Sequence, residues 1–206
     1  MTVSKREFTS ARHAQRRALC KACREVCKGT PWRSASGVLF AQRNGWFLAL
    51  HEMTNIVREE TRARFVVKPM AIDPIFWDLV GEPQLRSESL SFRYFGALTC
   101  PGLIIGEPDI GEEGGPPSIA GRMLERAEAK LDEVALWTTD EFLRGIEGSV
   151  NPGRLFATTI ATLISAGRAD DALARCEEAI ARQQVGGFLG RRGSFPETAA
   201  AWIRAA

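Results

Sequence analysis

Three cysteines within eight residues are the first feature of this sequence that could do chemistry. Cys20, Cys23 and Cys27 lie in the stretch ALCKACREVCKG, residues 18–29. Clustered thiolates can bind zinc or form a redox pair. On the helix that this stretch predicts, the three side chains share one side. Cys20 and Cys27 would be roughly 10 Å apart along the axis, too far for one zinc ion, so we predict core packing over metal or redox chemistry.

Other residues that could bind metal or act on a substrate are few. The stretch LHEMTN, residues 50–55, begins like a zinc-protease His-Glu-x-x-His motif but ends in Asn and lies in strand-like sequence. No Gly-x-Ser-x-Gly elbow or phosphate-binding P-loop is present, and GGFLGRRG at 186–193 lacks dinucleotide-binding spacing. We therefore predict no metal, no cofactor and no catalytic activity. An enzyme of unrecognised type that uses Asp73, Asp78, His51 or a cysteine is the third hypothesis.

Basic residues are concentrated near the beginning of the chain. Residues 1–70 contain 14 Lys and Arg against 5 Asp and Glu, whereas the remainder contains 13 against 20. Part of the excess forms one arc of the predicted first helix, at Arg17, Lys21, Arg24 and Lys28. This arc could follow phosphate groups, with Arg62 and Arg64 extending it, although such arcs are usually solvated faces. A nucleic-acid-associated protein is the second hypothesis.

Acidic residues gather in a loop rich in Gly and Pro, GEPDIGEEGGPPS, residues 106–118. Its carboxylates either belong to a solvated linker or present an acidic recognition surface to a basic partner. The loop also predicts a domain boundary, between residues 1–112 and residues 113–206. The candidate partner-binding residues are Glu107, Asp109, Glu112 and Glu113.

The first predicted domain consists of a helix and a β-meander. A helix over about residues 4–28 ends at Gly29, and Asn44-Gly45 predicts a tight hairpin because both residues tolerate positive φ. Asp73 is expected to cap a short helix that begins at Pro74. The predicted strands are residues 36–42, 46–55, 61–69, 89–100 and 102–107.

The second predicted domain is helical. Ser118 is expected to cap a long helix, Thr138 and Glu141 match a capping box, and a last helix covers about residues 196–204. The apolar residues of the long helix share one face: Ile119, Met123, Ala127, Leu131 and Val134. Periodicity predicts two antiparallel helices within residues 151–187, joined at Gly167. The fold class is α+β: an antiparallel β-meander of four to five strands packed with an N-terminal helix, followed by a C-terminal helical subdomain.

The pair of helices within residues 151–187 resembles one tetratricopeptide-repeat hairpin. Ala166-Gly167-Arg168, Ala172-Leu173 and Ala179-Ile180 stand where that family has small and apolar packing residues. The resemblance covers about one repeat, whereas roughly three are needed for a stable stack. It therefore implies the packing of a helical hairpin and does not extend to the peptide-binding role of that family.

The first domain resembles small bacterial α+β immunity proteins, which neutralise toxins. The features that carry this resemblance are NGWF at 44–47, KPMAIDPIFWDLVG at 68–81 and SFRYFGA at 91–97. The resemblance implies a non-catalytic protein-binding module, with an immunity or inhibitor role as its most specific form and a toxin as partner. This is the first hypothesis for function.

Composition agrees with an ordinary globular protein of 206 residues, 45% hydrophobic and 25% charged. The five cysteines are an odd number without the spacing of a disulfide framework, which favours a reducing, cytoplasmic environment. The longest uncharged apolar runs are shorter than the roughly 18 residues of a membrane span. We therefore expect a cytoplasmic protein with no membrane contact.

Overall fold

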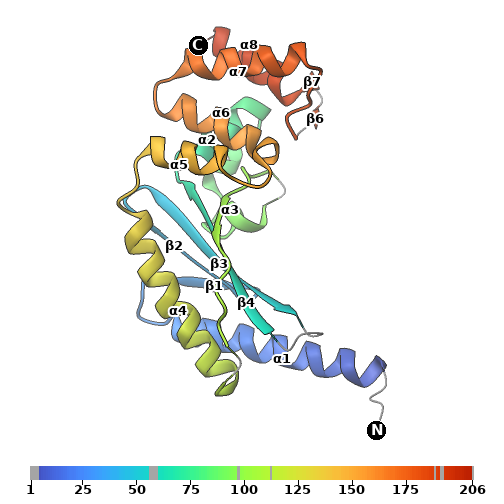
Figure 1. The fold of residues 1–206 in the computed structure, drawn as a ribbon, viewed down its shortest axis with the longest axis vertical. Helices are drawn as coiled ribbons and strands as arrows, with labels where there is room; N and C mark the ends of the chain where they lie inside the picture. Colours follow the sequence, from blue (N-terminus) through green and yellow to red (C-terminus); the bar gives the residue numbers. More distant parts are fainter. Residues whose placement is uncertain are drawn as a thin grey trace. The chain divides into compact units, whose positions relative to one another are not determined.

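The structure, a computed structural model, is an α+β fold in which a five-stranded antiparallel sheet is combined with helices, as the sequence predicts (Figure 1). It forms two compact units, each built from separate parts of the chain. The sheet unit comprises residues 1–67 and 104–135, and the helical unit comprises residues 68–103 and 136–206. The structure describes residues 5–55, 60–96, 98–111, 113–187, 189–190 and 193–205.

This division differs from the predicted boundary between residues 112 and 113. The helix α4 (Gly115–Val134), which follows the acidic loop, packs on the N-terminal helix α1 (Lys5–Val26) in the sheet unit. Residues 68–103 instead belong with the C-terminal helices. A Gly- and Pro-rich stretch marks a loop, but only long-range packing decides which unit the flanking elements join.

The sheet is a meander in which the strands lie in chain order. The predicted hairpin is confirmed: Arg43 pairs with Trp46, and Asn44 and Gly45 have φ values of 48° and 80°. Positive φ at both turn residues matches the strand twist, which explains the choice of Asn-Gly. The strands are β1 (Arg33–Ala35), β2 (Val38–Arg43), β3 (Trp46–Asn55), β4 (Glu60–Pro69) and β5 (Leu103–Gly106).

The predicted strand over residues 89–100 is wrong. This segment forms turns and a single helical turn, α3 (Phe92–Phe95), closed by a 2.7 Å hydrogen bond from Gly96 N–H to the Phe92 carbonyl. A Cβ at position 96 would lie 2.6 Å from that carbonyl oxygen, so the turn requires glycine. The alternation of apolar and polar residues in this segment therefore reflects partial burial around a turn. The short strand β1, beside β2, makes up the five strands of the sheet instead.

The core of the sheet unit lies where α1 and α4 pack on each other and on the strands. The predicted apolar face of α4 is confirmed, since all five of its expected members are buried. Ser118, however, lies inside this helix, which begins at Gly115 and carries Pro116 and Pro117 in its first turn, where no N–H is required. The buried face consists of Ile119, Met123, Ala127, Leu131 and Val134.

Polar contacts attach α4 to the sheet at Glu128. Its carboxylate accepts hydrogen bonds from the Trp32 indole N–H and from Arg43 Nη2, the latter at 2.6 Å. Partial burial acts to raise the pKa of Glu128, but these bonds and the Arg43 charge lower it below its usual value. Arg43 also pairs with Asp132 one turn further along the helix. These contacts fix the position of α4 against β2.

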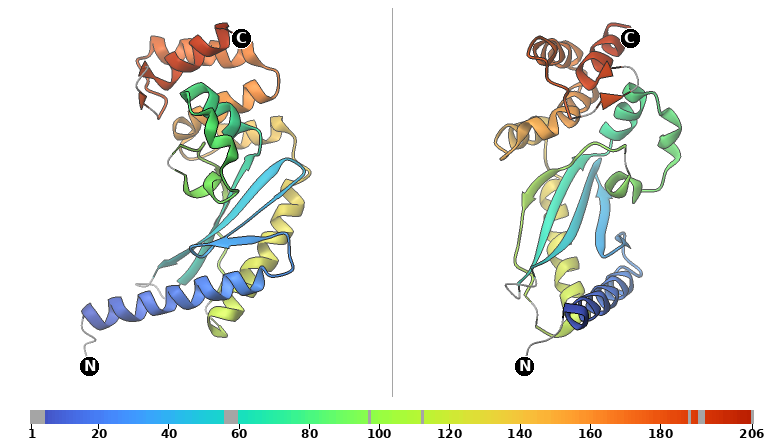
Figure 2. Two further views of the ribbon diagram at one scale, coloured as in Figure 1. Left: turned by 180° about the vertical axis from the view of Figure 1, so that it is seen from behind. Right: turned by 90° about the vertical axis from the view of Figure 1, so that its right-hand side faces the viewer.

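The helical unit contains one hydrophobic cluster formed mainly by α2, α6, α7 and α8. Figure 2 shows α7 and α8 side by side in both views. The predicted capping box of Thr138 and Glu141 and the predicted turn at Gly167 are both present. The elements are α2 (Ile72–Val80), η1 (Pro83–Ser87), α3, α5 (Thr139–Glu147), η2 (Pro152–Leu155), α6 (Phe156–Ser165), α7 (Ala169–Ala181), β6 (Leu189–Gly190), β7 (Gly193–Ser194) and α8 (Phe195–Ala205).

Small residues allow close packing in the hairpin of α6 and α7. Ala172 and Ala179 of α7 are buried, Leu173 is partly buried, and Ile180 is exposed. Ala172 and Ala179 therefore occupy packing positions as expected, whereas Ala166 and Ile180 are exposed. Within the described part of the chain, every helix is too short or too polar to cross a membrane.

A pair of leucine truncations tests the position of the core. Leu131 is fully buried in α4, whereas Leu136, five residues later, is 81% exposed. We expect Leu131→Ala to lower the free energy of unfolding by about 2–5 kcal/mol, because it leaves a cavity. Leu136→Ala serves as the matched control and should change it by less than about 0.5 kcal/mol. Denaturant unfolding followed by circular dichroism measures both, and equal losses would contradict the packing of α4.

Candidate functional site

A buried network of charged groups lies in the helical unit around Asp73. The Asp73 side chain is fully buried, and its Oδ1 accepts hydrogen bonds from Lys68 Nζ at 2.8 Å and from the Cys100 N–H at 3.0 Å. Its Oδ2 accepts from Arg93 Nη1 at 3.1 Å. Lys68 Nζ also donates to the Cys100 carbonyl at 2.9 Å. The network thus joins the end of β4, the start of α2 and two loop segments.

The predicted capping role of Asp73 is therefore wrong. The helix α2 begins at Ile72 after Ala71, so Asp73 lies in the first turn, and its carboxylate points to Lys68 and Arg93 rather than to a helix N–H. Neither Lys68 nor Arg93 was expected from the sequence to contact Asp73. The Lys68-x-x-x-x-Asp73 spacing could have suggested a local ion pair, but Arg93 is brought close only by the turn around α3.

The charged groups of this network form hydrogen bonds and ion pairs with one another, and these replace the contacts that water would make. Burial lowers the pKa of Lys68, and the Asp73 carboxylate acts in the opposite direction. The Arg93 guanidinium donates to the Met70 carbonyl at 2.8 Å and lies over the Trp77 ring, 5.6 Å from its centroid. Trp77 in turn donates its indole N–H to the Leu98 carbonyl at 2.5 Å. Because the carboxylate is used fully by internal donors, the arrangement is that of a structural linkage.

Asp78 and His51 are the other two residues that the enzyme hypothesis named. Asp78 pairs with Arg86 on the surface of the helical unit. His51 lies on β3 of the sheet unit and is half-buried. Burial lowers the pKa of His51, and the positive charges of Arg64 and Arg16 lower it further. Asp73 and Asp78 thus have different partners within the helical unit, and His51 belongs to the sheet unit.

All five cysteines are free thiols. Burial raises the pKa of Cys23 to about 12 and that of Cys27 to about 11, so both remain protonated at neutral pH. Burial also raises the pKa of Cys100, and it raises that of Cys176 to about 11. Protonated thiols are poor metal ligands and poor nucleophiles. Among the residues that the structure describes, no three His, Cys, Asp or Glu side chains are grouped to hold a metal ion.

The acidic loop is held in place by α4. Arg122 donates hydrogen bonds to the carbonyls of Ile110, Gly111 and Glu113, at 2.7, 3.0 and 3.0 Å. Ala63 of β4 donates its N–H to the Pro108 carbonyl at 3.0 Å. The described parts of the loop are thus attached to the sheet unit, and the loop does not link the two units.

The loop carboxylates differ in their surroundings. Glu107 pairs with Arg64 at 2.6 Å, and Asp109 Oδ1 accepts the Gly111 N–H at 2.9 Å. Glu113 is exposed, and Glu112 lies outside the described residues. The ion pair with Arg64 reduces the charge that Glu107 offers to a partner. Part of the charge of the described loop carboxylates is therefore used in contacts within the protein.

The predicted basic arc of α1 is exposed. Arg17, Lys21, Arg24 and Lys28 all face solvent, whereas Leu19 and the cysteines face inward. Lys28 pairs with Glu25 at 2.6 Å. Arg16, which the sequence analysis did not include, is also exposed. The basic arc is therefore available for contact with a partner.

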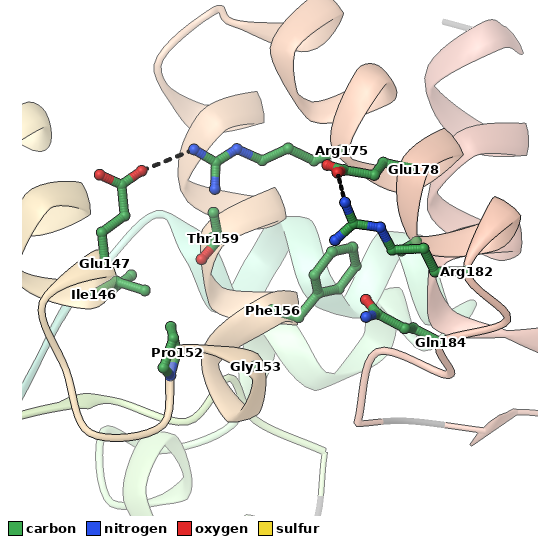
Figure 3. A pocket seen from close by; sticks show the side chains of 11 residues that line it. Ile146, Glu147, Pro152, Gly153, Phe156, Thr159, Arg175, Glu178, Arg182 and Gln184 are labelled. Atoms are coloured by element: carbon green, nitrogen blue, oxygen red, sulfur yellow. Dashed lines mark hydrogen bonds and ion pairs between the residues drawn. The ribbon is translucent and has the colours of Figure 1, made fainter.

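A groove of about 330 Å3 lies in the helical unit between η2, α6 and α7. Figure 3 shows the Phe156 ring among the lining side chains, with Thr159 of the same helix to its left in the view. Ion pairs form part of the lining: Arg175 contacts Glu147 at 2.9 Å and Arg182 contacts Glu178 at 2.6 Å. The lining consists of Ile146, Glu147, Pro152, Gly153, Phe156, Thr159, Arg175, Glu178, Ala179, Arg182 and Gln184.

Sequence reasoning missed this groove. The spacing of Arg175, Glu178 and Arg182 places them on one side of α7 and could have indicated a charged helix face. Glu147 and Phe156, however, come from other elements and meet this face only through the packing of α5 and α6. The groove is therefore a product of tertiary structure.

Comparison of the chain with models of protein families, with curated proteins and with solved structures finds no match.

Thiol labelling tests the packing of the cysteines. We expect a thiol reagent at neutral pH to modify Cys20 first, because it is the only one of the five that is partly exposed. The other four should react only after unfolding, and Cys20→Ser should abolish the fast phase. Mass spectrometry of time points identifies the modified residues. Rapid native modification of Cys23 or Cys27 would contradict the packing, as would stoichiometric zinc in the purified protein.

Two aspartates of α2 provide a matched test of the buried network. Asp73→Ala leaves Lys68 and Arg93 without their carboxylate, and we expect a loss of about 3–5 kcal/mol in the free energy of unfolding. Asp78→Ala removes only the surface pair with Arg86, and the loss should be below about 1 kcal/mol. Denaturant titration measures both values. Similar losses for the two variants would show that the Asp73 network is not a major source of stability.

Proposed function

We propose that this protein is a non-catalytic, cytoplasmic protein-binding module that uses the groove of the helical unit to hold a short segment of a partner protein. The observation that supports this most directly is the combination of Phe156 with two Arg–Glu pairs in one preformed groove. Aromatic and arginine side chains are enriched where protein interfaces gain most of their affinity. An inhibitor or immunity role is the most specific form of the proposal.

The apolar part of the groove supplies a place for a partner side chain. Phe156 is partly buried and packs edge-to-face on Phe195, with ring centroids 6.3 Å apart. Ile146 and Ala179 are buried beside the groove. This packing holds the groove residues in position before binding, which reduces the entropy lost on association. An apolar partner side chain over Phe156 would exclude water from the ion pairs around it.

The ion pairs define the charges of the partner segment. All four groups are more than 40% exposed, so each pair contributes little to folding and can exchange partners at low cost. A partner carboxylate would contact Arg175 or Arg182, and a partner Lys or Arg would contact Glu147 or Glu178. The expected partner segment thus combines one apolar side chain with flanking charges of both signs.

Loss of the groove arginines tests this function. We expect Arg175→Ala/Arg182→Ala to weaken binding of the partner by at least about tenfold, because both charge-assisted contacts are lost. The control, Arg144→Ala/Arg204→Ala, removes two exposed arginines of the same unit outside the groove. The tagged wild type and both variants are used for capture from the native host with mass spectrometry. Candidate partners are then measured by calorimetry.

Several outcomes of this experiment would contradict the proposal. Failure of the wild type to recover any protein partner would exclude the binding function, and equal affinity of both double variants would exclude the groove. A third variant, Glu107→Gln/Asp109→Asn/Glu113→Gln, tests the acidic loop in the same assay. If only this variant loses the partner, the acidic loop is the binding surface and the groove is not.

Co-expression tests the immunity form of the proposal. We expect a toxin encoded beside this protein to arrest growth when expressed alone, and co-expression of the wild type to restore growth. The groove variant should fail to restore growth, whereas the control variant should succeed. A partner that causes no arrest would leave a binding module but exclude the immunity role.

A further inference from the structure

The N-terminal helix carries a basic surface that the proposed protein-binding groove does not use. Residues 9–28 contain six Lys or Arg and one Glu. Every described side chain from position 13 to position 18 is exposed, so this part of α1 projects away from the packed core of its unit. We define the basic helix face by Arg16, Arg17, Lys21 and Arg24, all of which are exposed.

The composition of this face distinguishes between two kinds of partner. The exposed members of residues 9–28 that the structure describes are charged, polar or alanine, with no large apolar side chain among them. Protein interfaces gain most of their affinity from buried aromatic and apolar anchors. Binding to a phosphate backbone needs only cationic groups and is driven by the release of counterions. The face therefore fits a phosphate backbone better than it fits a folded protein.

The spacing of the charges agrees with an extended polyanion. Arg17, Lys21 and Arg24 lie four and three residues apart, which keeps them on one side of the helix and spreads them over roughly 10 Å. Arg64 of β4 does not extend this charge, because it is paired with Glu107 at 2.6 Å. The positive charge available to a polyanion is therefore that of α1 itself.

We infer that the basic helix face is a binding site for the phosphate backbone of nucleic acid, independent of base sequence. Arg17, Lys21 and Arg24 would contact phosphates from one side of the helix, and Arg16, about 100° around the axis from Arg17, would contact a phosphate at the edge of the site. The apolar side of α1, including Leu19 and Cys23, keeps the helix attached to its unit. The basic helix face and the groove use different residues and belong to different units. An experiment can therefore exclude one of the two binding sites without excluding the other.

Salt-dependent binding to DNA tests this site. We expect the wild type to bind a labelled duplex of about 20 base pairs, with an affinity that falls about 100-fold between about 50 and 200 mM salt for four phosphate contacts. Removing all four cations, in Arg16→Ala/Arg17→Ala/Lys21→Ala/Arg24→Ala, should abolish most of this binding and flatten the salt dependence. Fluorescence anisotropy measures both, and circular dichroism checks that the fold is retained.

Two further variants distinguish binding at the basic helix face from a general effect of the protein's net charge. The variant Arg16→Lys/Arg17→Lys/Arg24→Lys keeps the charge and should bind DNA within about threefold of the wild type, because phosphate contact needs charge rather than a particular base-reading geometry. The control Arg126→Ala/Arg144→Ala/Arg154→Ala/Arg204→Ala removes the same charge from exposed positions outside α1 and should bind as the wild type does.

Three results would overturn the inference. The first is no DNA binding by the wild type at low salt. The second is an equal loss of binding in the control variant, which would assign the effect to net charge. The third is binding of poly-glutamate as tightly as DNA, which would point to an acidic protein as the partner of this face.

Discussion

Burial of the Asp73 carboxylate imposes the strongest constraint on the helical unit. A charge in the interior is costly unless it is paired and hydrogen-bonded, and Asp73 meets this condition only when Lys68, Arg93 and the Cys100 N–H all reach it. Those three groups come from a strand end, a turn and a loop. The carboxylate therefore determines how residues 68–103 fold back beside the start of α2.

The packing around this network in turn shapes the groove. The helices α2, α6, α7 and α8 share one hydrophobic cluster, and Phe156 lies at its edge with one side in contact with Phe195. Rigid packing on one side allows the other side of Phe156 to line the groove. In the sheet unit, the Glu128 contacts with Trp32 and Arg43 have a comparable role, since they fix α4, which then holds the acidic loop through Arg122.

The two candidate surfaces differ in the physics of binding. The groove combines an aromatic floor with ion pairs of both signs, which suits a partner of defined shape. The basic helix face has charge without apolar anchors, which suits a flexible or repetitive polyanion. The two proposed sites lie in separate units of the chain, so binding through shape and binding through charge can be tested independently.

Short sequence patterns determined those elements whose conformation depends only on residues close by in the chain. Asn44-Gly45 specified its hairpin because both residues accept positive φ, Thr138 and Glu141 specified a helix start, and the period of α4 specified its buried face. Tertiary structure decided the rest. Residues 89–100 alternate like a strand but turn around Gly96, and Asp73 resembles a cap but binds Lys68 and Arg93. The groove likewise joins residues distant in sequence, and such pairings depend on packing energies that no local pattern contains.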